Sequence, residues 1–157
     1  MDTLSTRTGE DTDRLGRVGH VRAVLVRLAV LGIALTAYTL LVVPRMGDGG
    51  DAAIGAGLIA FAALATAGFV GCLVDAARVG AATAVAWWLL VAAGLAVGWW
   101  VALAVPRDAS MSFTELLAAD VGQLPFTFGL VAGPAVVGAA IGRATARTSD
   151  PSRTSHE

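Results

Sequence analysis

The chain has 157 residues, of which 56% are hydrophobic and 15% are charged, and its net charge is −1 at pH 7. A soluble domain is about half apolar and about a quarter charged, so this composition predicts an integral membrane protein that is embedded in a lipid bilayer. The balanced charge argues against nucleic acid as a partner, and the single cysteine, Cys72, excludes an intramolecular disulfide.

Four charge-free intervals divide the chain, over residues 28–44, 52–74, 79–106 and 121–142. A helix needs about 20 apolar residues to cross the hydrocarbon core of a bilayer. We therefore predict an all-α membrane protein, an up-down-up-down bundle of four transmembrane helices. The predicted spans cover about 24–44, 52–74, 80–105 and 125–142.

The spans define three parts of the chain. Residues 1–22 form a polar and basic cytoplasmic segment, residues 23–143 form the transmembrane domain, and residues 144–157 form a disordered cytoplasmic tail. All basic residues are arginine, and the chain is rich in Ala, Gly and Val, which indicates a GC-rich bacterial genome.

The arginines predict the orientation, because positive charge near helix ends concentrates on the cytoplasmic side. With the N-terminus inside, only Arg45 and Arg107 lie outside. Both termini are therefore predicted to lie in the cytoplasm, and the protein is predicted to reside in the bacterial cytoplasmic membrane. The arginines then on the cytoplasmic side are Arg7, Arg14, Arg17, Arg22, Arg27, Arg78, Arg143, Arg147 and Arg153.

Arg27 lies within the apolar pattern AVLVRLAVLG at the start of the first span. It is either a functional charge inside the membrane or a side chain that extends from the first turn into the inner headgroups. The second interpretation is favoured, because the membrane interface is near. Tyr38, with Thr36 and Thr39, supplies the polar content of the rest of this span.

Asp75 ends the apolar run of the second span, and Arg78 follows it at the i, i+3 spacing of a helical ion pair. The favoured interpretation pairs Asp75 with Arg78, or with Arg143 of the fourth span. The alternative is that Asp75 serves as a gate or an ion-coupling group.

All four tryptophans lie in the third span, and Trp88 and Trp99 share one helix face because about three turns separate them. A structural role at the membrane interface or toward lipid is favoured. The sharper alternative is an aromatic cage for a cationic or drug-like solute, which lacks an anionic partner inside the membrane.

The loop after the third span predicts a short amphipathic helix around 112–124 on the outer side. Ser112 and Glu115 have the spacing of a capping box, and apolar residues then recur at helical intervals. Interfacial structure is favoured over a role as a lid.

Small residues at the GxxxG spacing let helix backbones approach closely in a membrane. We predict helix packing at three such pairs, which are Gly94 and Gly98, Gly129 and Gly133, and Gly138 and Gly142. Pro134 is expected to kink the fourth span.

No Asp, Glu, Lys or His lies near the middle of any predicted span, and the sequence contains no catalytic triad pattern, metal-ligand cluster or phosphate loop. We therefore expect no enzyme activity, no cofactor and no metal site. The residues that remain as candidates for a functional role are Arg27, Tyr38, Asp75, Arg78, Trp88 and Trp99.

The second span ends in GFVGCLVDAAR, the third carries tryptophan, and the fourth reads FTFGLVAGPAVVGAAIGR. In these features the chain resembles small actinobacterial four-span membrane proteins that are related to the drug/metabolite transporter superfamily. The resemblance covers most of residues 22–143 and implies a dimeric, transporter-like protein. The chain lacks the membrane-embedded glutamate of the small multidrug exporters in that superfamily, so proton-coupled drug export is not implied.

Two functions are compatible with these features. The chain is either a small transporter-like protein or a non-catalytic accessory or scaffolding subunit of a larger membrane complex. Its protein partner is accordingly a second copy of itself or another membrane subunit.

Overall fold

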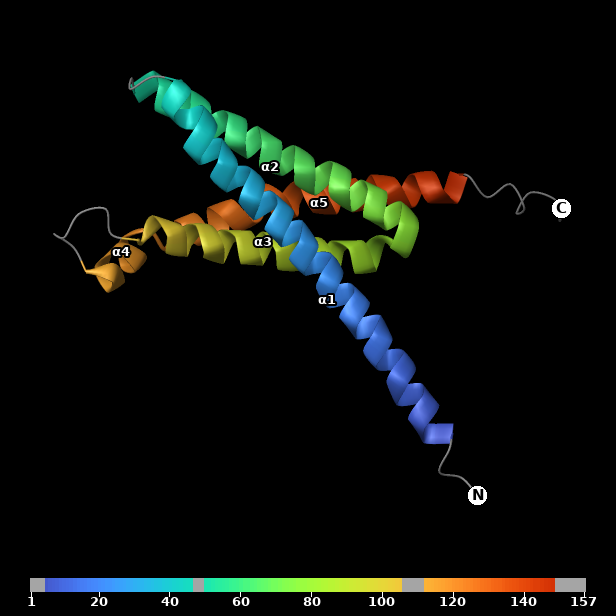
Figure 1. Cartoon of the computed structure of the whole chain (residues 1–157). Coiled ribbons are helices and arrows are strands. Elements are labelled where there is room, and N and C mark those ends of the chain that lie inside the picture. Colours follow the sequence, from blue (N-terminus) through green and yellow to red (C-terminus); the bar gives the residue numbers. More distant parts are fainter. Residues whose placement is uncertain (1–4, 47–49, 106–111, 149–157) are drawn as a thin grey trace.

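The computed structural model describes residues 5–46, 50–105 and 112–148, and these ranges form helices joined by short turns (Figure 1). No strand occurs within them. The helices are α1 (Ser5–Ala37), α2 (Gly50–Val79), α3 (Ala81–Leu103), α4 (Phe113–Ala119) and α5 (Gln123–Thr148). After α1 the chain continues through a π-helical turn, Tyr38–Val42, and a 3-10 turn, Val43–Arg45.

Four of these helices are long and apolar enough to cross a membrane. This confirms the prediction of an all-helical chain with four helices of membrane-spanning length. Their apolar stretches are Gly19–Arg45, Ile54–Val79, Ala81–Leu103 and Gln123–Thr145. Three helices are longer than predicted, and the first helix already begins at Ser5, within the polar and basic segment 1–22. The second continues through Asp75 to Val79, and the fourth continues to Thr148, within the tail predicted as disordered. The rest of that tail, residues 149–157, lies outside the described residues.

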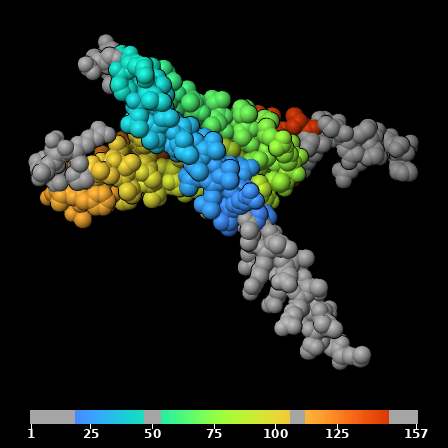
Figure 2. Space-filling view, in the orientation of Figure 1, coloured from blue at the N-terminus to red at the C-terminus, as the bar shows by residue number. Residues whose placement is uncertain are grey.

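Three of the long helices, α2, α3 and α5, lie side by side, and α1 crosses them obliquely (Figure 1). The most extensive contact joins α2 to α5, followed by α3 with α5, whereas α1 contacts the bundle chiefly through α3. Cys72, Trp88, Val91 and Val131 belong to the buried core between α2, α3 and α5. None of the α1 side chains described is buried, and Figure 2 shows this helix as a ridge on the surface.

Glycine allows the close approach of α2 and α5. A Cβ atom on Gly138 would overlap the carbonyl oxygen of Phe69, and one on Gly142 would lie 2.8 Å from the carbonyl oxygen of Leu73. Lipid provides no hydrophobic drive for helix association, so this backbone contact is a main source of stability. Pro134 lies inside α5, and the helix continues on both sides of it.

The six glycines predicted to pack fall into two groups. Gly94, Gly138 and Gly142 lie at contacts between helices, with Gly94 facing Leu28 of α1. The other three, Gly98, Gly129 and Gly133, are exposed, and an added Cβ would meet no neighbouring helix within 4 Å.

The predicted capping box opens α4. The Ser112 hydroxyl accepts a hydrogen bond from the Glu115 backbone N–H, and the Glu115 carboxylate accepts one from the Ser112 backbone N–H at 2.8 Å. The helix ends at Ala119, earlier than predicted, and Trp100 Nε1 donates to the Leu117 carbonyl at 2.9 Å. This bond attaches α4 to the end of α3.

Replacement of Gly138 by alanine tests the close approach of α2 and α5. Gly138→Ala should lower the free energy of unfolding by about 1–3 kcal/mol, because the added methyl group meets backbone that can yield only by separating the helices. Gly55→Ala is the control, because a Cβ there meets nothing within 4 Å. Unfolding in detergent micelles gives the measurement, and equal stability of the two variants would contradict the packing described.

The capping box makes α4 sensitive to pH. The Ser112 backbone N–H, with the Ser112 hydroxyl, lowers the pKa of Glu115 below its ordinary value of 4.5. This stabilisation is therefore present above pH 4.5 and is lost as the pH falls through the lowered pKa. Ser112→Ala should shift the pKa of Glu115 back toward 4.5 in an NMR titration. An unchanged pKa would show that the hydroxyl is not bonded to the carboxylate.

Candidate functional site

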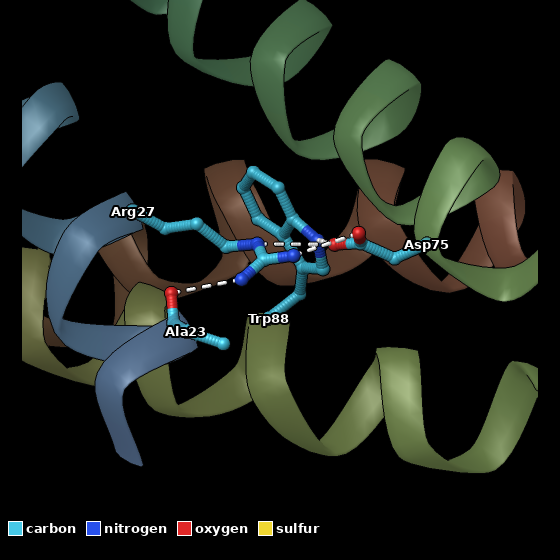
Figure 3. A network of polar contacts seen from close by, with 4 residues as sticks. All are labelled: Ala23, Arg27, Asp75 and Trp88. Carbon is cyan, nitrogen blue, oxygen red and sulfur yellow. Dashed lines mark hydrogen bonds and ion pairs between the residues drawn. The ribbon is translucent and has the colours of Figure 1, made fainter. Parts of the chain in front are cut away.

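An ion pair joins α1 to α2 near the end of the bundle where α2 meets α3 (Figure 3). Arg27 Nη2 lies 2.7 Å from Asp75 Oδ1, and Arg27 Nε donates to Asp75 Oδ2 at 3.1 Å. The third guanidinium nitrogen donates to the Ala23 carbonyl at 2.8 Å. Such a bidentate geometry is the strongest form of an arginine–carboxylate contact. The side chains of Arg27 and Asp75 are 24% and 12% exposed.

Two tryptophans of α3 complete this network. Trp88 is 5% exposed and its Nε1 donates to Asp75 Oδ2 at 2.9 Å. The guanidinium carbon of Arg27 lies 5.1 Å from the ring centre of Trp87, which is a cation–π distance. His20 of α1 packs edge-on against the same Trp87 ring, at 5.2 Å between centroids. The charges of Arg27 and Asp75 are thus satisfied by each other and by aromatic groups from a third helix.

Three interpretations favoured from the sequence were wrong. Asp75 pairs with Arg27, whereas Arg78 and Arg143 are exposed and form no ion pair with it among the described residues. The guanidinium of Arg27 therefore turns to α2 rather than outward to the headgroups. Trp88 does not face lipid, because its ring is buried against Gly71 and its nitrogen is bonded to Asp75.

The aromatic cage considered for Trp88 and Trp99 is not formed by these two residues. Trp88 belongs to the ion-pair network, and its neighbour Trp87 contacts a cation of the protein itself, Arg27. Trp99 lies about three turns further along α3 and lines a separate cavity.

This cavity has a volume of about 370 Å³ and lies between all four long helices, toward the opposite end from the ion pair. Its walls are mostly apolar and include Leu64 of α2 and Leu95 of α3. The polar residues that line it are Tyr38, Thr39, Trp99, Gln123 and Thr127. Every lining residue is uncharged. The structure thereby brings together Tyr38 and Trp99, two of the residues singled out in the sequence.

The π-helical turn Tyr38–Val42 places Tyr38 and Thr39 on the cavity wall. Tyr38 Oη donates to the Ala56 carbonyl of α2 at 2.8 Å, and Thr39 Oγ1 donates to the Leu35 carbonyl at 2.9 Å. Single π-helical turns inside longer helices occur frequently at functional sites. Here the turn supplies a second polar contact between α1 and α2.

Thr127 lines the cavity, and its hydroxyl has no protein partner among the described residues. Thr36, Thr39 and Thr66 each donate to the carbonyl four residues earlier, the usual bond of a helical threonine. Thr127 is 8% exposed and makes no hydrogen bond within the described part of the chain. Among the described residues, every side-chain oxygen or nitrogen that is fully buried has a hydrogen-bond partner. Because Thr127 Oγ1 has no partner, it must retain some accessible surface, and Thr127 is one of the residues that line the cavity.

Trp99 also makes no hydrogen bond among the described residues, unlike its neighbour Trp100. The cavity lining therefore includes two residues, Trp99 and Thr127, whose indole N–H and hydroxyl make no hydrogen bond within the described residues. Sequence reasoning did not identify Thr127, because a threonine near a helix start is ordinary and the missing bond is visible only in three dimensions.

No family model, curated protein or solved structure matches this chain. No group of three His, Cys, Asp or Glu side chains that could hold a metal ion occurs in residues 5–46, 50–105 and 112–148. The geometry of the ion pair and the cavity is therefore the main structural evidence on function.

Removal of the guanidinium of Arg27 tests the ion pair. Arg27→Gln should lower the free energy of unfolding in detergent by about 1–3 kcal/mol, because the buried Asp75 loses hydrogen bonds from a charged donor. Arg78→Gln is the matched control, since Arg78 is exposed at the end of α2, and its effect should stay within about 0.5 kcal/mol. Equal effects of the two substitutions would show that the pair contributes nothing to stability.

Proposed function

We propose that this chain is a small transporter-like protein of a bacterial cytoplasmic membrane. Its four long helices cross the bilayer in alternating directions, with both termini in the cytoplasm. The resemblance to actinobacterial four-span proteins related to the drug/metabolite transporters supports the class, and the excess of arginine at one end supports the orientation. The observation that carries the proposal is a cavity at one end and a polar network at the other.

A transporter needs a central site that opens alternately to either side of the membrane. With the N-terminus inside, the cavity lies in the outer half of the bundle. The ion pair then lies close to the cytoplasmic face, because Asp75 is about 6 Å from the end of α2 at 1.5 Å per residue. Between them lies the buried core around Val91 and Val131. In this arrangement the ion pair closes the inner side.

In the proposed mechanism, α1 is the helix that moves. Two polar contacts join α1 and the π-helical turn after it to α2, the Arg27–Asp75 pair and the Tyr38–Ala56 hydrogen bond. Between them an apolar space of about 220 Å³ separates the two helices. The other three helices are packed through glycine and share a buried core. Breaking the ion pair would therefore release α1 to move while α2, α3 and α5 stay together, which is the gate role considered for Asp75.

Self-association is the second part of the proposal. The exposed glycines Gly129 and Gly133 lie one turn apart on α5. Neither they nor Gly98 of α3 contact another helix within the described residues. Small residues on an outer face allow a helix of another subunit to approach closely. A second copy of the chain is the partner proposed.

The same exposed glycines favour the alternative function. A non-catalytic accessory or scaffolding subunit would use the face formed by Gly129 and Gly133 to bind a different membrane protein. Such a subunit does not need α1 to move.

Access of a thiol reagent to the cavity separates the two functions. Cys72 is the only native cysteine, so a Cys72→Ala background can carry Thr127→Cys as a single reporter. A membrane-impermeant reagent should modify the reporter in right-side-out vesicles and should fail to modify it in inside-out vesicles. Addition of Arg27→Gln should produce modification from the cytoplasmic side, because α1 is then released.

The control for this experiment is Arg78→Gln, which removes an exposed arginine and leaves the ion pair intact. It should leave the labelling pattern unchanged. If Arg27→Gln also leaves the pattern unchanged, α1 does not gate the cavity, and the accessory-subunit function is favoured.

A further inference from the structure

We infer that the cavity binds an uncharged, mainly apolar molecule that carries one hydroxyl head group. This inference rests on the proposed function, because it names the class of solute that the transporter would take. It follows from the charge, the hydrogen-bonding groups and the size of the cavity.

The charge of the walls excludes ionic ligands. None of the residues that line the cavity is charged. Asp75 and Arg27, the ion pair of the described bundle, lie toward its other end and are bonded to each other. A cation or an anion in the cavity would lose its hydration without gaining a counter-charge, which is strongly unfavourable in an apolar environment. The preferred ligand is therefore neutral.

The hydrogen-bonding groups favour a hydroxyl. Tyr38 and Thr39 already donate their protons to the carbonyls of Ala56 and Leu35, so toward a ligand their oxygens can only accept. An indole N–H can only donate, and Trp99 has no protein acceptor among the described residues. The unbonded hydroxyl of Thr127 can do both. A ligand hydroxyl also donates and accepts, so it matches these groups and the side-chain amide of Gln123, whereas a carbonyl can only accept.

The size and the apolar walls define the rest of the molecule. At about 370 Å³ the cavity is near the lower end of the range of small-molecule sites, which is about 300–1,000 Å³. Leu64, Leu95 and Leu130 are among the side chains that would contact an alkyl chain or a ring. A medium-chain alcohol such as 1-octanol represents this chemistry and serves as the probe.

An acyl chain of a membrane lipid is the competing occupant. The apolar space between α1 and α2 shares lining residues with the cavity, among them Leu35 and Ala60, so a lipid chain has a route toward it. A lipid chain has no hydroxyl to place beside Thr127 and Trp99. The two occupants therefore differ in their dependence on Thr127.

Photolabelling with an octanol that carries a diazirine on its chain tests the inference. The full chain is reconstituted in phosphatidylcholine nanodiscs, irradiated with the probe and digested for mass spectrometry. The cross-links should fall on residues that line the cavity, such as Tyr38 and Leu103. Excess 1-octanol should suppress them, and octanoate or octylammonium should not, because both are charged.

Two pairs of variants identify the site. Gly57→Leu fills the cavity from the α2 wall and should abolish the cavity cross-links, whereas Gly55→Leu places the same side chain outside the lining and should not. Thr127→Val keeps the shape and removes the hydroxyl, and should weaken competition by 1-octanol about tenfold. Thr66→Val is its control, because Thr66 is exposed and bonds its own helix.

The outcomes are distinct. Cross-links that survive Gly57→Leu would place the probe on the outer surface and overturn the inference. Equal competition by octylammonium or octanoate would overturn the neutral class, and an unchanged octanol affinity in Thr127→Val would indicate an acyl chain as the occupant. The readout does not depend on movement of α1. Cavity binding that persists when thiol access fails to respond to Arg27→Gln would retain the site and remove the transport function.

Discussion

The ion pair between Arg27 and Asp75 holds α1 against the rest of the bundle, and the cavity depends on it because α1 forms one of the cavity walls. Inside a membrane, apolar side chains gain little by leaving lipid for protein. The helix α1 has no buried residue, so the ion pair adds to the packing of side chains such as Leu28 on α3. A charged group in that environment is costly unless it is paired. Each charge of the pair therefore requires the other, and the pair fixes the depth of α1 relative to α2.

The helices α2, α3 and α5 are held together by a different kind of contact. Gly138 and Gly142 bring the backbones of α2 and α5 together over more than one turn, and Gly71 makes room for the ring of Trp88. The glycine contacts themselves are close-packed and involve backbone and apolar side chains, although Trp88 of α3 also donates to the carboxylate of Asp75. The protein thus consists of three helices that share a buried core and of α1, which packs on α3 and is joined to α2 by polar contacts. The proposed gating of the cavity relies on this difference between α1 and the other three long helices, and not on any single residue.

The local features could be predicted from the sequence because each depends on residues close together in the chain. Long charge-free intervals correspond to the four long helices, and the spacing of Ser112 and Glu115 predicts the capping box at the start of α4. The features that depend on contact between helices could not be predicted. Arg27 and Asp75 are 48 positions apart, and the sequence offers Asp75 a nearer partner in Arg78. Arg27 near the start of the first predicted span and Asp75 at the end of the second lie on the same side of the predicted bundle, and this was the one available signal.

The same limit explains the glycines and Thr127. Gly129 and Gly133 have the same spacing as Gly138 and Gly142, yet only the second pair meets another helix of the chain. Which face of α5 turns inward is decided by packing against Phe69 and Leu73 and not by the motif itself. Whether the hydroxyl of Thr127 bonds its own helix likewise depends on local geometry near the start of α5.

The distance between α1 and α2 tests most directly whether the ion pair holds α1 in place. Spin labels at Val30 and Val70, which are both exposed, report this distance by pulsed electron resonance in nanodiscs when Cys72 is replaced by alanine. With Arg27 and Asp75 intact, a single narrow distribution is expected, and Asp75→Asn should broaden it and shift it to longer distances. A distribution that Asp75→Asn leaves unchanged would contradict the account, because α1 would then be held in place without the ion pair.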